Sequence, residues 1–196
     1  MEKLRLGFYG HSTCAYRGPT SFIDIVAKEF NATIVNTGVR MGSEERALLA
    51  LKQTQPNIAV VFHSQSRLIP TLNRDYDCDA SSEWGLKDHE LPMLHSYRNH
   101  LRNIELERAR LYGAAMQIEQ YCTDLGITLI NCVDPTHPFP SWIKMSSPDP
   151  IPMTLATEHK CAFHEHPNGV TLEGSKLIGE HLINRITARG REVKCI

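Results

Sequence analysis

Hydrophobic residues in this chain gather in short runs of strand length, and the segments between the runs show helical spacing. The runs lie at residues 4–9, 32–36, 58–62 and 127–133. They are rich in β-branched and aromatic residues, which is typical of strands. The run at 58–62 is apolar at every position, as expected of a central parallel strand that is covered on both faces.

Between these runs, apolar residues recur every three or four positions, which predicts helices. One helix follows residues 18–21. A second begins at Ser43, a preferred N-cap residue, and the next two residues are glutamates, which the helix dipole favours in the first turn. A long helix is predicted over 101–122 and a last one from 172 to about 186. The alternation of strands and helices up to residue 62 predicts an α/β fold, a flavodoxin-like three-layer α/β/α sandwich with a mainly parallel sheet.

Residues 66–96 lose this periodicity. The segment is polar, contains Tyr76 and Trp84, and follows the carboxyl end of the third predicted strand. Loops of this length in compact domains often serve a function, so we predict a lid or specificity loop, with an ordinary surface excursion as the alternative. The proline-rich stretch at 136–152 predicts a second loop. The whole chain, 1–196, is predicted to be one domain with an insertion at about 66–96.

Charge and composition narrow the range of partners. The 21 basic and 22 acidic side chains give a formal net charge of -1, so no overall field favours nucleic acid or an anionic membrane. No apolar run approaches membrane-spanning length, and the first residues lack the apolar stretch of a signal peptide. We therefore expect a cytoplasmic protein with no nucleic-acid or membrane partner, whose cysteines are more often thiols than disulfides.

The first candidate for chemistry is Ser12, in the sequence Gly10-His11-Ser12 directly after the first predicted strand. A hydroxyl at a turn from strand to helix lies above the carboxyl edge of a sheet, beside backbone N–H groups of the next helix. That position suits the nucleophile of an acyl transfer. In the alternative interpretation, Ser12 only caps the following helix.

Two other loops are predicted to reach the same edge, because the carboxyl ends of parallel strands meet there. One holds Gly38, and the other begins at His63, which is expected to line a substrate pocket together with Tyr76 and Trp84. A histidine-rich segment at 158–169 precedes the last helix. A histidine in that position is placed to reach Ser12.

In their order, and over nearly the whole chain, these motifs resemble those of the SGNH (GDSL-like) hydrolase family. Gly10-His11-Ser12 stands where the family has Gly-Asp-Ser, Asn36-Thr37-Gly38 resembles the second block, and His166-Pro167-Asn168 resembles the histidine block. The resemblance implies the SGNH type of α/β/α fold. It also implies a serine esterase or acyl hydrolase that acts on a small-molecule or glycan ester without a cofactor.

The resemblance assigns a role to each matched residue. Ser12 would attack the ester carbonyl, and His166 would take the serine proton and return it to the leaving alcohol. The backbone N–H groups of Ser12 and Gly38 and the side-chain amide of Gln65 would hold the oxyanion. Glycine at position 38 suits this role, because a bare backbone lets a substrate approach closely.

The chain departs from the family pattern in two blocks. The third block is usually Gly-x-Asn-Asp, but here it reads His63-Ser64-Gln65-Ser66, so Gln65, His63 or Ser64 would supply its donor. The family's acid position holds Phe163, which cannot orient an imidazole, and the candidates to replace it are Glu165, His164 or a backbone carbonyl. The sequence therefore predicts a Ser-His dyad or a degenerate triad.

Other interpretations stay open. His159, Cys161, His164 and His166 lie within eight positions and are ligand types that zinc prefers, although their spacing matches no common zinc motif, so no metal is expected. An alignment on residues 171–174 would place His166 at the acid position and leave no base. A separate alternative is an SGNH-like fold that serves as a binding or structural module without turnover, which the missing acid, the altered third block and the uncertain position of the histidine favour. The Gly7-x-x-Gly10 turn lacks the spacing of a nucleotide-binding loop.

Overall fold

The computed structural model describes residues 3–10, 12–15, 18, 20–38, 42–63, 68–69, 76–77, 90–136, 139–159 and 170–193. Within these residues, the main sheet contains four parallel strands, in the order β2-β1-β3-β6. The strands are β1 (Arg5–Gly10), β2 (Thr33–Asn36), β3 (Ile58–Phe62) and β6 (Thr128–Cys132). They coincide with the predicted runs to within a residue or two, which confirms the parallel α/β fold.

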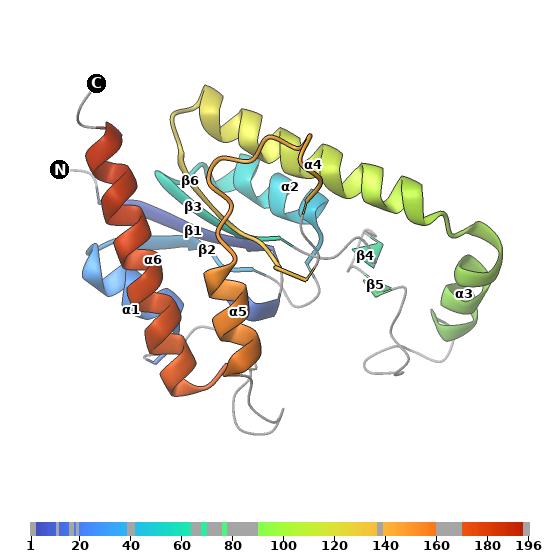
Figure 1. Ribbon diagram of the computed structural model, residues 1–196, viewed down its shortest axis with the longest axis horizontal. Helices are drawn as coiled ribbons and strands as arrows, with labels where there is room; N and C mark the ends of the chain where they lie inside the picture. Colours follow the sequence, from blue (N-terminus) through green and yellow to red (C-terminus); the bar gives the residue numbers. More distant parts are fainter. Residues whose placement is uncertain are drawn as a thin grey trace.

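The register of the sheet brings the carboxyl ends of three strands to one level. Gly10 of β1 pairs with Phe62 of β3, and Phe62 pairs with Cys132 of β6. The three strands β1, β3 and β6 therefore end at the same edge of the sheet (Figure 1).

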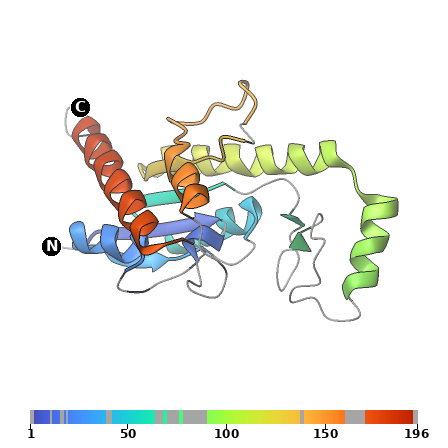
Figure 2. The same cartoon turned by 60° about the horizontal axis from the view of Figure 1, so that its bottom comes forward.

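Helices cover both faces of the sheet, as Figures 1 and 2 show. One face packs against α1 (Phe22–Glu29), α5 (Ile151–Glu158) and α6 (Leu172–Val193), and the other against α2 (Glu44–Thr54) and α4 (Ile104–Asp124). The side chains of β3 alternate between the two cores, because successive strand residues point to opposite faces. The three-layer α/β/α arrangement agrees with the prediction from the sequence.

Short polar residues fix where the helices begin. The Ser21 hydroxyl accepts a hydrogen bond from the Asp24 N–H (3.2 Å), and the Ser43 hydroxyl accepts one from the Arg46 N–H (3.3 Å). Ser43 is thus the N-cap of α2, as predicted, and such a cap stabilises a helix by about 1 kcal/mol. Because α2 begins immediately after the loop that follows β2, the cap also fixes the end of that loop.

Two helices were not predicted. The stretch predicted as a proline-rich loop, 136–152, ends in the first turn of α5. Pro150 is the N-cap of this helix and Pro152 lies in its first turn, where proline is tolerated because the N–H groups there have no helical partner. The stretch expected to be an irregular insertion contains the short antiparallel pair β4 (Leu68–Ile69) and β5 (Tyr76–Asp77) and ends in α3 (Glu90–Ser96). A π-helical turn, Tyr97–Leu101, joins α3 to α4, and α3 stands away from the sheet (Figures 1 and 2).

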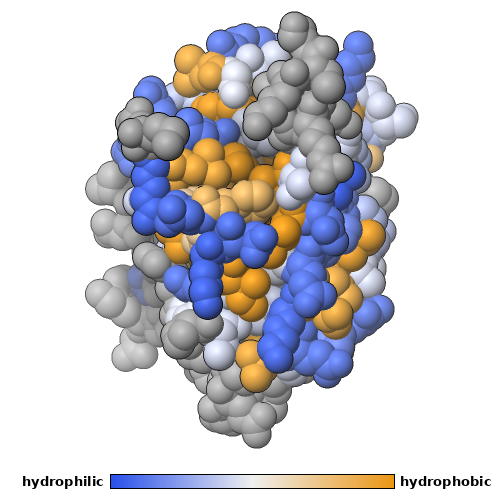
Figure 3. All heavy atoms as spheres, turned by 90° about the vertical axis from the view of Figure 1, so that its left-hand side faces the viewer, coloured by the Kyte–Doolittle hydropathy of each residue, from blue (hydrophilic) through white to orange (hydrophobic). Residues whose placement is uncertain are grey.

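Figure 3 shows the side of the molecule where β1 begins, at the left of Figure 1. Hydrophobic side chains gather in the middle of this side, between hydrophilic ones. Among the described helices, none is long and apolar enough to cross a membrane.

Candidate active site

Ser12 lies directly above the carboxyl end of β1. The strand ends at Gly10, and Ser12–Cys14 forms a single turn of 3-10 helix. In the sheet order, β1 lies between β2 and β3, and the chain passes from β1 to β2 over one face and from β2 to β3 over the other. In open parallel sheets, ligands bind at such a switch point, outside the carboxyl ends of the strands.

Gly10 is a position of β1 at which the backbone of β3 leaves no room for a side chain. Its φ angle is +97°, and a Cβ atom added there would lie 2.0 Å from the Phe62 carbonyl oxygen. Since that atom belongs to the backbone, no side-chain rearrangement would make room for it. The first residue of the Gly10-His11-Ser12 motif is therefore glycine for a steric reason, and the chain turns sharply there.

Gly38 contacts the turn that contains Ser12. It is buried, and its N–H donates a hydrogen bond to the Cys14 carbonyl oxygen (2.9 Å). Asn36, at the end of β2, donates its side-chain amide to the Phe8 carbonyl oxygen (2.6 Å). Two of the predicted blocks thus meet in space. The Gly38 N–H, however, is already bonded within the protein, so it must exchange this partner before it can hold an oxyanion.

His63, the first residue after β3, lies inside the protein with 3% of its surface exposed. Its Nδ1 lies 3.3 Å from a carboxylate oxygen of Glu44 and its Nε2 lies 2.9 Å from Asn131 Oδ1, while Phe139 packs edge-on against the ring (5.1 Å between centroids). His63 therefore supports the loop from within the core, and direct contact with a substrate remains a prediction.

The side-chain amide of Asn131 extends the polar contacts of His63 to α4 and to the loop that contains Ser146. Its Nδ2 donates to Glu119 Oε1 (2.5 Å) and to the Ser146 carbonyl oxygen (3.1 Å), and Ser146 N–H donates to the same Glu119 oxygen (2.8 Å). These acceptors orient the Asn131 amide so that its oxygen faces His63. Because that oxygen only accepts hydrogen bonds, His63 Nε2 carries a proton.

Two opposing effects act on the pKa of His63. Burial disfavours the charged imidazolium and by itself would lower the pKa of His63, but the charge and hydrogen bonding of Glu44, the hydrogen bond to Asn131 and the charge of Glu119 outweigh it and raise the pKa. The charged form of His63 is thus favoured by an acidic neighbour on each of two helices, α2 and α4. Sequence reasoning placed Glu44 only as a favourable charge in the first turn of a helix.

Cys14 lies two residues after Ser12 and offers a second nucleophile on the same turn. It is fully buried, its thiol donates to the Tyr9 carbonyl oxygen (3.3 Å), and burial raises its pKa to about 12. Since the thiolate is the reactive form of cysteine, Cys14 is unreactive in the folded protein. Cys14, Cys122 and Cys132 form no disulfide, as the sequence predicts.

We expect Cys14, Cys122 and Cys132 to remain unmodified when the native protein is treated with iodoacetamide at neutral pH. Burial raises the pKa of Cys122 to about 12 as well, and it raises the pKa of Cys132 well above the ordinary value of a thiol. Peptide mass mapping before and after denaturation measures the modification of each thiol. Rapid native alkylation of Cys14 would contradict the packing described for this turn.

Several predicted site residues lie outside the described residues: Gln65, Trp84, His164, Glu165 and His166. Tyr76 is described only through the backbone of β5. Of the possible zinc ligands, His159 alone is described, and the described part of the chain contains no cluster of side chains that would hold a metal. The Thr171 N–H donates to the His159 carbonyl oxygen (2.8 Å), so these two described residues, on either side of 160–169, lie close together.

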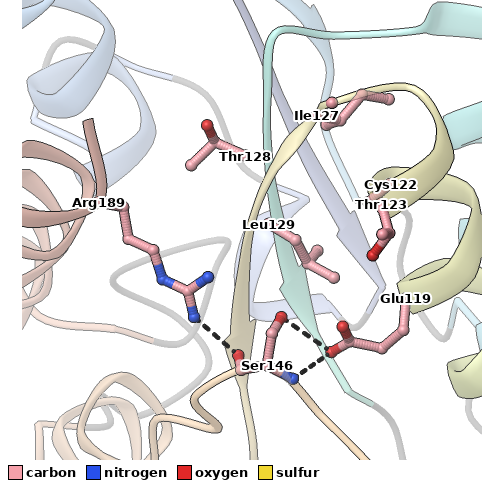
Figure 4. Close-up of a pocket in the computed structure, with 9 residues that line it drawn as sticks. Glu119, Cys122, Thr123, Ile127, Thr128, Leu129, Ser146 and Arg189 are labelled. Atoms are coloured by element: carbon pink, nitrogen blue, oxygen red, sulfur yellow. Dashed lines mark hydrogen bonds between the residues drawn. The ribbon is translucent and has the colours of Figure 1, made fainter. Parts of the chain in front are cut away.

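Two cavities flank β6, at opposite ends of the strand. The larger, about 290 Å³, lies at the start of β6, where Glu119 and Arg189 approach Ser146 from opposite sides (Figure 4). It is therefore far from the strand end that carries Ser12. The smaller, about 200 Å³, is mostly apolar and lies beyond the carboxyl end of β6, where Val133 and Phe139 line it. Only the smaller cavity lies at the edge of the candidate site, since Phe139 also contacts His63.

The chain was also compared with known proteins. No protein-family model matches it, and neither does any curated protein. A solved structure from Desulfitobacterium hafniense DCB-2, described as "a putative lipolytic protein of G-D-S-L family", is similar over 93% of this chain and 99% of that one, with 12% sequence identity and a TM-score of 0.40. The two proteins are therefore distant in both sequence and backbone geometry.

Sequence reasoning did not single out Asn131 or Glu119. Asn131 is an amide residue in the buried part of a mostly apolar strand, and that position was the available signal, because buried polar side chains need hydrogen-bond partners. Glu119 lies in a helix rich in charged residues, where nothing in the sequence distinguishes it from solvent-exposed glutamates. The partners of His63 therefore emerge only from the fold.

Proposed function

We propose that this protein is a serine hydrolase of the SGNH type that cleaves an ester or acyl group, with Ser12 as the nucleophile and His166 as the base. The observation that carries the proposal is the position of the Ser12–Cys14 turn at the switch point of the parallel sheet, in contact with the loop that holds Gly38. The resemblance of the sequence motifs supports the same reaction class.

In this mechanism, Ser12 Oγ forms a bond to the carbonyl carbon while His166 takes its proton. The leaving alcohol receives that proton as the tetrahedral intermediate collapses to an acyl-enzyme, and water releases the acyl group in a second, equivalent step. The backbone N–H of Ser12 and the amide of Gln65 would donate to the oxyanion, and Gly38 would join them once its bond to Cys14 is exchanged. Glu165 or His164 would orient His166.

The substrate is proposed to be a small-molecule or glycan ester. Tyr76 and Trp84, in the insertion, are proposed to shape the pocket that receives it. The apolar cavity beside Val133 and Phe139 lies at the same edge and would suit an apolar portion of the ester.

Hydrolysis of a p-nitrophenyl ester by purified protein tests the proposal. We expect turnover by the wild type and a loss of about a thousandfold or more in kcat for Ser12→Ala and His166→Ala, because nucleophile and base act as a unit. Thr20→Ala, an exposed hydroxyl before α1, is the matched control and should retain full activity. Wild-type turnover that survives in Ser12→Ala would contradict the assignment of the nucleophile.

A binding module without turnover is the second candidate function. The observation that favours it is the hydrogen bond from the Gly38 N–H to Cys14, which leaves one predicted oxyanion donor engaged. The absence of hydrolysis and of labelling by a fluorophosphonate, in a folded wild-type protein, would support this candidate over the hydrolase.

A further inference from the structure

Glu44 and His63 belong to two different loops of the candidate site. Glu44 is the first residue of α2 and ends the loop that follows β2 and holds Gly38. His63 begins the loop that follows β3. Their side chains meet with 3.3 Å between His63 Nδ1 and Glu44 Oε2, and less than 2% of either side chain is exposed.

A proton must lie between these two groups. His63 Nε2 already carries one, because it faces the Asn131 oxygen, which only accepts. If Nδ1 and the Glu44 carboxylate were both deprotonated, their lone pairs would face each other in the protein interior. The contact therefore holds a proton between the imidazole and the carboxyl group, and the charges of Glu44 and of Glu119 beyond Asn131 both raise the pKa of His63 against the effect of burial.

Such a pair needs an explanation other than stability. Removing two charged groups from water costs much of what their attraction returns, and apolar residues of similar volume often serve a core as well. What a buried pair supplies is a fixed geometry between the elements that carry it, as long as its remaining hydrogen bonds are satisfied. Here His63 also donates its backbone N–H to the Cys132 carbonyl oxygen (2.9 Å), which anchors it to β6.

We propose that Glu44 and His63 are positioning residues that hold the loops after β2 and β3 together at the candidate active site. Through α2 and its Ser43 cap, the pair fixes the end of the loop whose Gly38 N–H is bonded to the Ser12–Cys14 turn. The effect on catalysis rests on the proposed hydrolase function. The mechanical coupling of the two loops does not.

Amide hydrogen exchange measured by NMR tests the coupling at two described hydrogen bonds, those of the Gly38 and His63 N–H groups. Glu44→Gln keeps the size of the side chain and removes its charge. We expect both amides to exchange about tenfold faster or more in this variant. Glu45→Gln is the matched control, because Glu45 lies in the same helical turn but pairs with Arg110, and both amides should stay within about twofold of the wild type.

Faster exchange at His63 alone, at Gly38 alone or at neither would overturn the proposal. Should Glu44→Gln fail to fold, His63→Gln reports on Gly38 in the same way. NMR of the ring nitrogens in the wild type needs no variant, and the absence of a proton shared between His63 Nδ1 and Glu44 would also overturn the proposal.

The catalytic consequence has a separate readout. The rate at which a fluorophosphonate labels Ser12 should fall about tenfold or more in Glu44→Gln and stay unchanged in Glu45→Gln, since small misplacements of catalytic groups are costly. If the wild type is not labelled, the proposed hydrolase function fails, while the exchange experiment still decides whether the loops are coupled. If exchange rises at both amides but labelling is unaffected, the positioning role is wrong.

Discussion

The Gly10→Ala variant is expected to lose about 3 kcal/mol or more of its free energy of unfolding, because two penalties fall on one residue. Residues other than glycine rarely adopt a φ angle of +97°. In addition, the new Cβ would lie 2.0 Å from the Phe62 carbonyl oxygen. A loss of this size is a large part of the roughly 5–15 kcal/mol by which domains are stable. Urea denaturation followed by circular dichroism measures it.

Gly113→Ala is the matched control. Gly113 lies within α4, and an added Cβ meets no heavy atom within 4 Å. Alanine there should leave the protein as stable or stabilise it by roughly 0.5–1 kcal/mol, because glycine weakens a helix interior. Equal effects of the two substitutions would contradict the close approach of β1 and β3 and, with it, the geometry of the turn that carries Ser12.

The second large effect is expected for Asn131→Leu. Leucine matches the volume of asparagine approximately, but it leaves the His63 Nε2–H without its acceptor and removes one donor from Glu119. His63 is buried and Glu119 is half-buried, and an unsatisfied polar or charged group is costly away from water, so we expect a loss of about 2–4 kcal/mol. The same urea denaturation measures this change.

Gln120→Leu serves as its control, because Gln120 is exposed on α4 and bonds only Asp124 at the surface among the described contacts. Its effect should stay within about 0.5 kcal/mol. An equally small effect of Asn131→Leu would contradict this expectation, because it would mean that the polar contacts linking Glu44, His63, Asn131 and Glu119 contribute little to the free energy of unfolding.

The strands and the first helices could be predicted because their signals are local. The run at 58–62 is apolar on both faces and became the fully buried β3, and Ser43 with the glutamates behind it became the cap and first turn of α2. Helix α5 was missed because Pro150 and Pro152 are read from sequence as helix breakers, although the first turn of a helix accepts them.

The candidate site was predictable only in part. Topology alone places Ser12 and Gly38 at one edge of the sheet, and the contact between Gly38 and Cys14 agrees with it. The sequence carries no sign that the Gly38 N–H would already be bonded, or that Glu44 and Asn131 would hold His63, because these contacts join residues far apart in the chain. The role of His166 stays a prediction from the motif.

The most direct test of the central claim is mass spectrometry of the protein after treatment with a fluorophosphonate, followed by digestion. A nucleophilic serine at the switch point predicts a single adduct, located on the peptide that contains Ser12 and lost in Ser12→Ala. An adduct on another serine, or an unmodified wild-type protein that is fully folded, would contradict it.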